Sequence, residues 1–142
     1  MDQFNRMLAR CEPMVLSIFR IMVGLLLFQY GVAKILKFPV LPYFANIPPL
    51  IAFAGWLELV LGALLILGLF TRPVAIILSG EMAFAYFMGH MFKAGIGAPV
   101  FIPLLNGGNA AILFCFACLY LACAGGGVWS LDAMMRKRAS YQ

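Results

Sequence analysis

The sequence predicts an all-α transmembrane four-helix bundle with up-down topology, formed by a single domain over residues 1–142. Hydrophobic residues make up 65% of the chain and charged residues 11%, whereas an ordinary soluble domain carries about 25% charged residues. So few charges could not cover the apolar surface of a soluble fold of this length. Four apolar stretches also approach the ~20 residues needed to cross a bilayer. The lipid bilayer is therefore the predicted partner, and nucleic acid is not, because the cations form no stripe with interleaved aromatics.

The predicted spans cover residues 14–36, 50–70, 73–92 and 109–127. The first span is too long for the apolar region of a signal peptide and contains Arg20 and Lys34, so we interpret it as a retained span. The tight turn at Thr71-Arg72-Pro73 predicts that the second and third spans form an antiparallel hairpin. The apolar stretch of the fourth span ends within the run Gly125-Gly126-Gly127. Beyond it, Ser130-Leu131-Asp132 is typical of a helix start and precedes a short basic segment expected on the inner membrane surface.

The cations are distributed unequally between the two ends of these spans. With four crossings, one side of the membrane receives Arg6, Arg10, Arg72, Arg136, Lys137 and Arg138. The loops on the other side contain Lys37 and Lys93. Because basic residues remain preferentially on the cytoplasmic side, this asymmetry predicts a multi-pass protein of the bacterial inner membrane with both termini in the cytoplasm.

Four ionisable residues lie well inside the predicted spans: Arg20, Lys34, Glu58 and Glu81. Each costs about 2.5–3.5 kcal/mol at the membrane centre, so each should face the protein interior and meet a partner. With a rise of about 1.5 Å per residue, Arg20 lies level with Glu81, and Lys34 leans toward Glu58. The predicted buried pairs are therefore Arg20–Glu81 and Lys34–Glu58.

Small residues share the faces that carry these charges. At about 100° per residue, one stripe of the first span contains Arg20, Gly24, Leu27, Gly31 and Lys34. The second span repeats the pattern with Gly55, Glu58 and Gly62. Because glycines allow helices to approach closely, we expect both faces to form the interior of the bundle.

The buried charges have two alternative interpretations. In the first, the pairs only fix the register of the helices, at a cost in stability. In the second, Lys34 and Glu58 form a ligand or proton site in the outer half, together with His90 and Asn109. Asn109 opens the fourth span, where free backbone N–H groups could hold an anionic or carbonyl-bearing ligand, although a plain helix cap is the alternative. For His90, the alternative is a hydrated position near the membrane surface.

Cys115 and Cys118 form a C-x-x-C pair, which can carry dithiol redox chemistry. The pair lies in the middle of an apolar span, where a thiolate forms with difficulty, so we expect these cysteines to pack as small hydrophobes. No residues have metal-ligand spacing, and with a single histidine neither a zinc nor a haem site is expected. A nucleophile–base–orienter set is not visible either.

Taken in order, these residues resemble the DoxX family of small four-span bacterial membrane proteins. The resemblance covers Arg20-x-x-x-Gly24, Gly31-x-x-Lys34, Glu58, Gly68-x-x-Thr71-Arg72, Glu81, His90, Asn109 and Gly125-x-Gly127-x-x-Ser130-Leu131-Asp132. Gly126 departs from the family pattern, which often has proline between the two glycines. The resemblance implies that His90 and Asn109 are site candidates. It also implies a link to membrane redox complexes, since the family name comes from subunits of a thiosulfate:quinone oxidoreductase.

We therefore expect an accessory subunit of a quinone-linked membrane redox system or of a maturation system. A small-ligand pocket is expected in the outer half, between the first, second and fourth spans, with a quinone as a candidate ligand. As an isolated chain it is not expected to be an enzyme, although it could serve as an oxidoreductase subunit with membrane or redox partner proteins. The competing class is a non-enzymatic assembly or chaperone-like membrane protein whose charge pairs are structural. A transporter is a third class, disfavoured by the absence of inverted repeats, although a homo-oligomer could form a pore.

Overall fold

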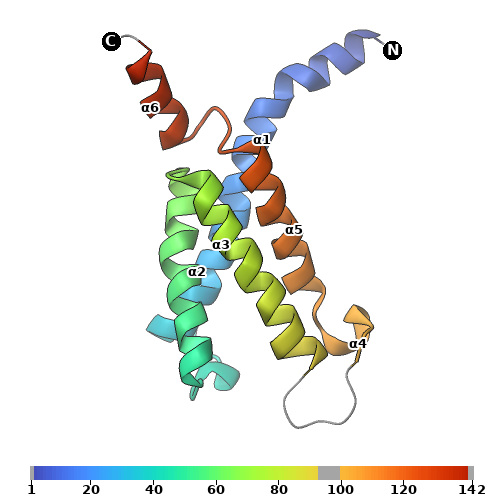
Figure 1. The fold of residues 1–142 in the computed structure, drawn as a ribbon, viewed down its shortest axis with the longest axis vertical. Helices are drawn as coiled ribbons and strands as arrows, with labels where there is room; N and C mark the ends of the chain where they lie inside the picture. The colour runs from blue at the N-terminus through green and yellow to red at the C-terminus, as the bar shows by residue number, and fades with distance from the viewer. Residues whose placement is uncertain (1, 93–99, 141–142) are drawn as a thin grey trace.

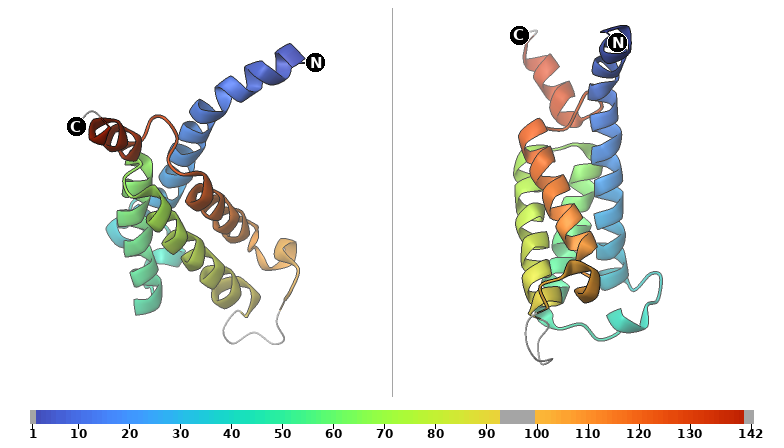
Figure 2. Two further views of the ribbon diagram at one scale, coloured as in Figure 1. Left: turned by 45° about the horizontal axis from the view of Figure 1, so that its top comes forward. Right: turned by 90° about the vertical axis from the view of Figure 1, so that its right-hand side faces the viewer.

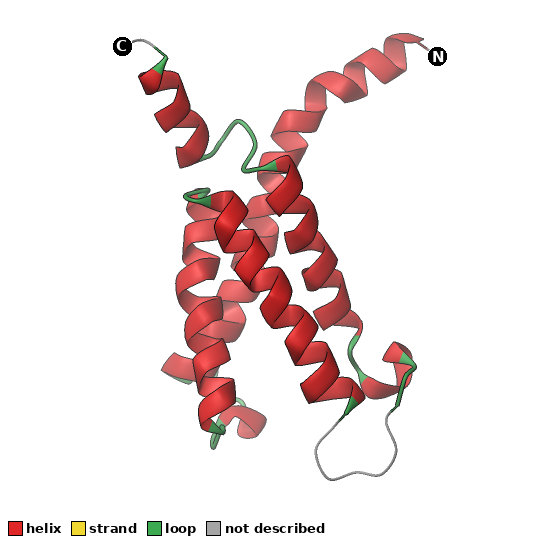
Figure 3. Ribbon diagram, in the orientation of Figure 1, coloured by secondary structure: helices red, strands yellow, loops and turns green. Residues whose placement is uncertain are grey.

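The computed structural model describes residues 2–92 and 100–140. Within these residues the chain consists of helices and connecting loops without a strand (Figure 3), which confirms the all-α prediction. The long helices are α1 (Asp2–Gly31), α2 (Pro49–Leu67), α3 (Thr71–Phe84) and α5 (Asn109–Ala124). Shorter elements are η1 (Val32–Leu36), η2 (Pro42–Phe44), η3 (Ala85–Met91), α4 (Pro103–Asn106) and α6 (Leu131–Ala139).

Three continuous helical segments are long and apolar enough to cross a membrane: Asp2–Leu36, Pro49–Leu67 and Thr71–Met91. They correspond to the first three predicted spans. The fourth apolar helix, α5, has 16 residues and ends at Ala124, three residues before the predicted limit. It ends there because Gly125 adopts φ +90°, outside the helical region.

The first helix begins much earlier than predicted, at Asp2, and passes through Pro13. Proline inside a helix removes one backbone donor and favours a kink. The carbonyl of Pro13 accepts a hydrogen bond from the Ser17 hydroxyl at 2.9 Å. The N-terminal part of α1 leans away from the other helices (Figure 1). The proline therefore marks the point where the packed part of α1 starts, not the start of the helix.

The long helices pack mainly as two pairs, α1 with α2 and α3 with α5, and α2 also contacts α3 (Figure 2). The core between them contains the buried side chains Val23, Leu27, Leu65, Val74, Ala75, Leu78, Met82, Cys118, Leu121 and Ala122. Both termini lie at one end of the molecule, and the loops containing η2 and α4 lie at the other (Figure 1). Ser130 accepts a hydrogen bond from the Ala133 amide and caps α6, as predicted. Lys93, one of the cations used for the orientation, lies outside the described residues.

The glycine-bearing faces predicted to be interior are buried, because α1 and α2 approach each other closely there. A Cβ added to Gly31 would lie 2.6 Å from Leu59 Cα, and one added to Gly62 would lie 2.9 Å from the Phe28 amide nitrogen. Backbone atoms cannot move aside as a flexible side chain can. The glycines thus set the distance between these two helices.

Replacing Gly31 with alanine is expected to lower the free energy of unfolding by about 1–3 kcal/mol, because the new methyl group must push α1 away from α2. Gly80→Ala is the matched control in α3, where an added Cβ meets nothing within 4 Å. The control should leave stability unchanged or raise it by up to about 1 kcal/mol. Thermal unfolding in detergent measures both changes. Equal effects of the two substitutions would contradict the close packing of α1 on α2.

Candidate functional site

Lys34 and Glu58, which the sequence predicts to pair, lie in direct contact. The Lys34 Nζ donates hydrogen bonds of 2.7 Å to both carboxylate oxygens of Glu58. The two side chains are 13% and 3% exposed, respectively. Lys34 comes from η1 and Glu58 from α2, and Gly55 makes room between them, since a Cβ there would lie 2.8 Å from Lys34 Cβ. A buried pair of this kind forms a charge-assisted and strongly directional contact.

Two aromatic rings lie close to the same ammonium group. The Lys34 Nζ lies 5.9 Å from the ring centroid of Tyr30 and 5.8 Å from that of Phe44. These distances are within cation–π range. Phe44 belongs to η2, and its carbonyl accepts a 2.6 Å hydrogen bond from Lys37 Nζ. The segment between α1 and α2 therefore places the Phe44 ring next to the Lys34 ammonium.

Glu81 of α3 is the third charged residue of this region. Its carboxyl group is within electrostatic reach of Glu58 and Lys34. Both carboxyl oxygens are buried, and they have no hydrogen-bond partner among residues 2–92 and 100–140. A buried polar group without a partner costs free energy unless a proton or a ligand satisfies it. Lys34, Glu58 and Glu81 together are called the Lys34 cluster below.

Arg20 does not pair with Glu81, which corrects the second predicted pair. Its guanidinium is fully buried and donates to backbone carbonyls instead. Nε bonds to Gly126 O at 2.8 Å, and Nη2 bonds to Trp129 O at 2.6 Å. Nη1 bonds to Leu65 O at 2.5 Å and also to Ile66 O. Arg20 thus joins α1 to the end of α2 and to the glycine-rich loop after α5.

Arg20 lies level with the end of α2, whose last carbonyls accept its hydrogen bonds. Glu81 lies about 15 Å beyond the start of α3 at Thr71, at a rise of about 1.5 Å per residue, so the two side chains are at different depths. The extensive contacts of α1 are with α2, and those of α3 are with α5. The last carbonyls of any helix lack intrahelical partners and carry the negative end of its dipole. The end of α2 therefore offers Arg20 acceptors at close range. The signal that could have indicated this arrangement is the level of Arg20, which matches the end of the second predicted span.

His90 and Asn109, the other two predicted ligand residues, make no hydrogen bond to the ion pair among the described residues. His90 Nδ1 is 3.1 Å from the carbonyl oxygen of Asn106. Asn109 is exposed at the start of α5. The structure thus joins two of the four predicted ligand residues, Lys34 and Glu58.

Asn106, which the sequence reasoning missed, organises the loop before α5. Its Oδ1 accepts a 2.7 Å hydrogen bond from the Gly108 amide, and its Nδ2 donates to Val100 O at 2.8 Å. The signal was Asn106-Gly107-Gly108 after a proline-containing segment, since asparagine followed by glycine is typical of turns. The loop is therefore shaped by an asparagine side chain next to His90.

The C-x-x-C cysteines take part in helix packing. Cys118 is fully buried in the core, and Cys115 is partly buried. The carbonyl of Cys115 accepts a 2.9 Å hydrogen bond from the Ser79 hydroxyl on α3. Both thiols are free. These contacts attach α5 to α3.

Comparison with known proteins gives two matches. The DoxX family model matches residues 15–91, more than half of the chain and the part that contains the Lys34 cluster and Arg20. An uncharacterized protein of Haemophilus influenzae is 41% identical over 134 residues, which is 92% of this chain and 98% of that relative. No solved structure matches the chain significantly.

Proposed function

The chain belongs to the DoxX family, and on that premise we propose that it is an accessory subunit of a quinone-linked membrane redox or maturation system. The Lys34 cluster would bind a small polar ligand, with a quinone as the leading candidate. The observation that carries this proposal is the buried Glu81 carboxyl, which has no hydrogen-bond partner among the described residues and lies within electrostatic reach of Lys34 and Glu58. Ionisable residues inside a membrane commonly mark ligand or proton sites.

The donor chemistry of the Lys34 cluster fits a quinone. Quinone carbonyls accept hydrogen bonds, the Lys34 ammonium has three N–H donors, and a protonated carboxyl adds an O–H donor. Two of the ammonium donors contact Glu58. The neighbouring rings of Tyr30 and Phe44 supply an apolar and aromatic surface of the kind that lines most small-molecule sites. When bound, the quinone would supply redox chemistry, and the chain would position it and exclude water.

The proposal includes four crossings of the bacterial inner membrane in up-down order, with α5 as the fourth. At about 1.5 Å per residue, the 16 residues of α5 extend ~24 Å, somewhat less than a hydrocarbon core of ~30 Å. Local thinning of the bilayer could accommodate this difference. The N-terminal part of α1, the start of α3 and α6 lie at the end of the molecule that carries the termini (Figure 1). These segments contain Arg6, Arg10, Arg72 and the basic residues of α6, which supports cytoplasmic termini. Partner proteins of a redox system, or further copies of the chain, would complete the assembly.

Purified protein carrying Glu81→Gln is expected to lose the thermal stabilisation that a short-chain ubiquinone gives the unaltered protein. Because Glu81 has no hydrogen-bond partner among the described residues, the substitution should leave the unfolding temperature without ligand unchanged or raised. Loss of binding would then not reflect loss of fold. Glu12→Gln, on the exposed part of α1, makes the same replacement of a carboxyl by an amide and should leave binding intact.

Quinone content extracted from the purified proteins gives a second measurement that does not depend on redox turnover. Binding that survives Glu81→Gln but disappears in His90→Asn or Asn109→Ala would move the ligand site to the loop before α5. Absence of any bound quinone, with stoichiometric capture of a client protein, would favour the assembly class and contradict the quinone proposal.

A further inference from the structure

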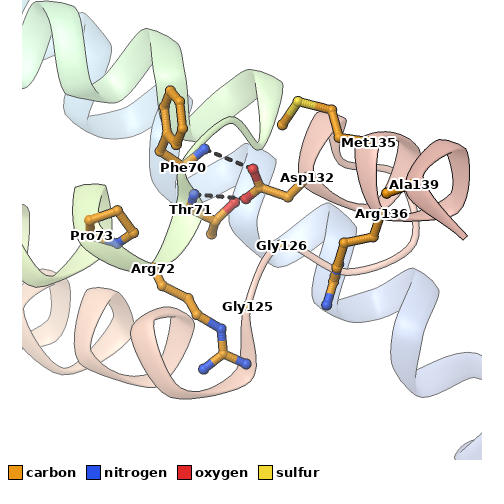
Figure 4. A pocket seen from close by; sticks show the side chains of 10 residues that line it. All are labelled: Phe70, Thr71, Arg72, Pro73, Gly125, Gly126, Asp132, Met135, Arg136 and Ala139. Carbon is orange, nitrogen blue, oxygen red and sulfur yellow. Dashed lines mark hydrogen bonds between the residues drawn. The ribbon is translucent and has the colours of Figure 1, made fainter.

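A groove of about 510 Å³ opens at the end of the molecule where both termini lie (Figure 4). It lies between the start of α3, the end of α5 and the helix α6. Its lining residues are Phe70, Thr71, Arg72, Pro73, Gly125, Gly126, Asp132, Met135, Arg136 and Ala139. The groove is thus at the opposite end of the helices from the loop that contains η2, and the function proposed above does not use it.

Two guanidinium groups border this groove from different elements. Arg72 comes from α3 and Arg136 from α6 (Figure 4). Arg72 donates one hydrogen bond of 3.3 Å, to Ala122 O, although a guanidinium has five N–H donors. In the part of the chain that the structure describes, neither arginine lies within ion-pair distance of an acidic side chain. The two cations therefore retain donors for an external anion.

Asp132, the one acidic residue of the lining, is already engaged. Its two oxygens accept hydrogen bonds of 2.8 Å from the backbone amides of Phe70 and Thr71, at the start of α3. Burial alone would raise the pKa of Asp132, but the hydrogen bonds from Thr71 and Phe70 and the charge of Arg136 hold it below its ordinary value. The carboxylate thus accepts hydrogen bonds from the free backbone amides at the start of α3. With two arginines and one aspartate in its lining, the groove has an excess of positive charge.

The elements around the groove have the composition of a membrane interface. Trp129, Met134 and Met135 are exposed, and the last turn of α6 contains Arg136, Lys137 and Arg138. A short helix with apolar residues and a basic end is typical of the level of lipid headgroups, where tryptophan is also enriched. Phe70 and Met135 add exposed apolar surface to the groove itself. An occupant should therefore combine a negative head with an apolar body.

We propose that this groove binds the phosphate group of an anionic phospholipid through Arg72 and Arg136. Arginine pairs with phosphate oxygens through two parallel N–H bonds, and basic pockets between membrane helices on the cytoplasmic side suit anionic headgroups. The acyl chains would leave the groove along Phe70 and the apolar surface of α3. The bound lipid would connect α6 to the hairpin between α2 and α3.

The test compares lipid binding by the full-length protein and two double variants, using native mass spectrometry with phosphatidylglycerol and with phosphatidylcholine. R72Q/R136Q is expected to lose about tenfold or more in affinity for phosphatidylglycerol. K137Q/R138Q removes the same charge from the same end of the protein and should change that affinity by less than about threefold. Phosphatidylcholine should bind weakly to all three proteins.

The single variant R136Q is expected to remain folded, because Arg136 is exposed and the hydrogen bond from Arg72 to Ala122 O stays in place. It therefore separates loss of lipid binding from loss of fold. It should still weaken phosphatidylglycerol binding several-fold. Equal losses in the two double variants, or no preference for phosphatidylglycerol, would overturn the proposal. Inorganic phosphate that displaces the lipid or stabilises the protein as well as the lipid does would also overturn the lipid assignment.

Discussion

Replacing Arg20 with methionine is expected to lower the free energy of unfolding by about 3–5 kcal/mol, enough to prevent stable folding. The guanidinium is fully buried and donates to carbonyls of Leu65, Ile66, Gly126 and Trp129. Methionine fills much of the same volume but leaves these carbonyls without a donor. The expected result is little folded protein in the membrane fraction and a low unfolding temperature in detergent.

Arg10→Met is the matched control, because Arg10 is on the same helix and is exposed. It should leave folding unchanged. Arg20→Lys should fall between the two, since one ammonium group cannot reach carbonyls in three directions with the geometry of a guanidinium. If Arg20→Met folded as well as Arg10→Met, the contact between α1, the end of α2 and the glycine-rich loop would not be a main determinant of stability.

Replacing Glu58 with glutamine is expected to lower the free energy of unfolding by about 3 kcal/mol. The substitution keeps the shape of the side chain but removes the carboxylate that contacts the Lys34 ammonium at 2.7 Å, in a pair whose side chains are 13% and 3% exposed. Lys34→Gln should be similarly harmful, because it leaves the carboxylate alone. Thermal and denaturant unfolding in detergent measure both losses.

The double variant K34Q/E58Q measures the interaction between the two charges, apart from the effect of each substitution alone. The double variant should lose at least about 1 kcal/mol less free energy of unfolding than the two single variants together, because neither charge remains buried without its partner. Glu81→Gln serves as the comparison, since Glu81 is a buried carboxyl without an ion-pair partner in the described residues. Strictly additive losses in K34Q and E58Q would contradict a coupled ion pair between η1 and α2.

The sequence was sufficient to locate the charges and one of their pairs. Lys34 and Glu58 lie on consecutive apolar segments, and consecutive segments pack together in this fold. Their depths therefore predicted their contact. The glycine stripes could be predicted for the same reason, because a 3.6-residue period assigns Gly24, Gly31 and Gly62 to the faces that the charges require.

Hydropathy and helical period are properties of each segment alone, so they determined an all-helical chain with apolar helices and buried charges. They do not specify how extensive the contact between each pair of helices is, and only the tertiary structure decided that α1 packs mainly on α2, and α3 mainly on α5 rather than on α2. Because α1 packs on α2, Arg20 lies next to the backbone carbonyls at the end of α2, which have no hydrogen-bond partner within the helix. The tertiary structure also left the Glu81 carboxyl buried and without a hydrogen-bond partner in the described residues, and it brought Arg72 and Arg136 to one groove, although 64 positions separate them in the chain.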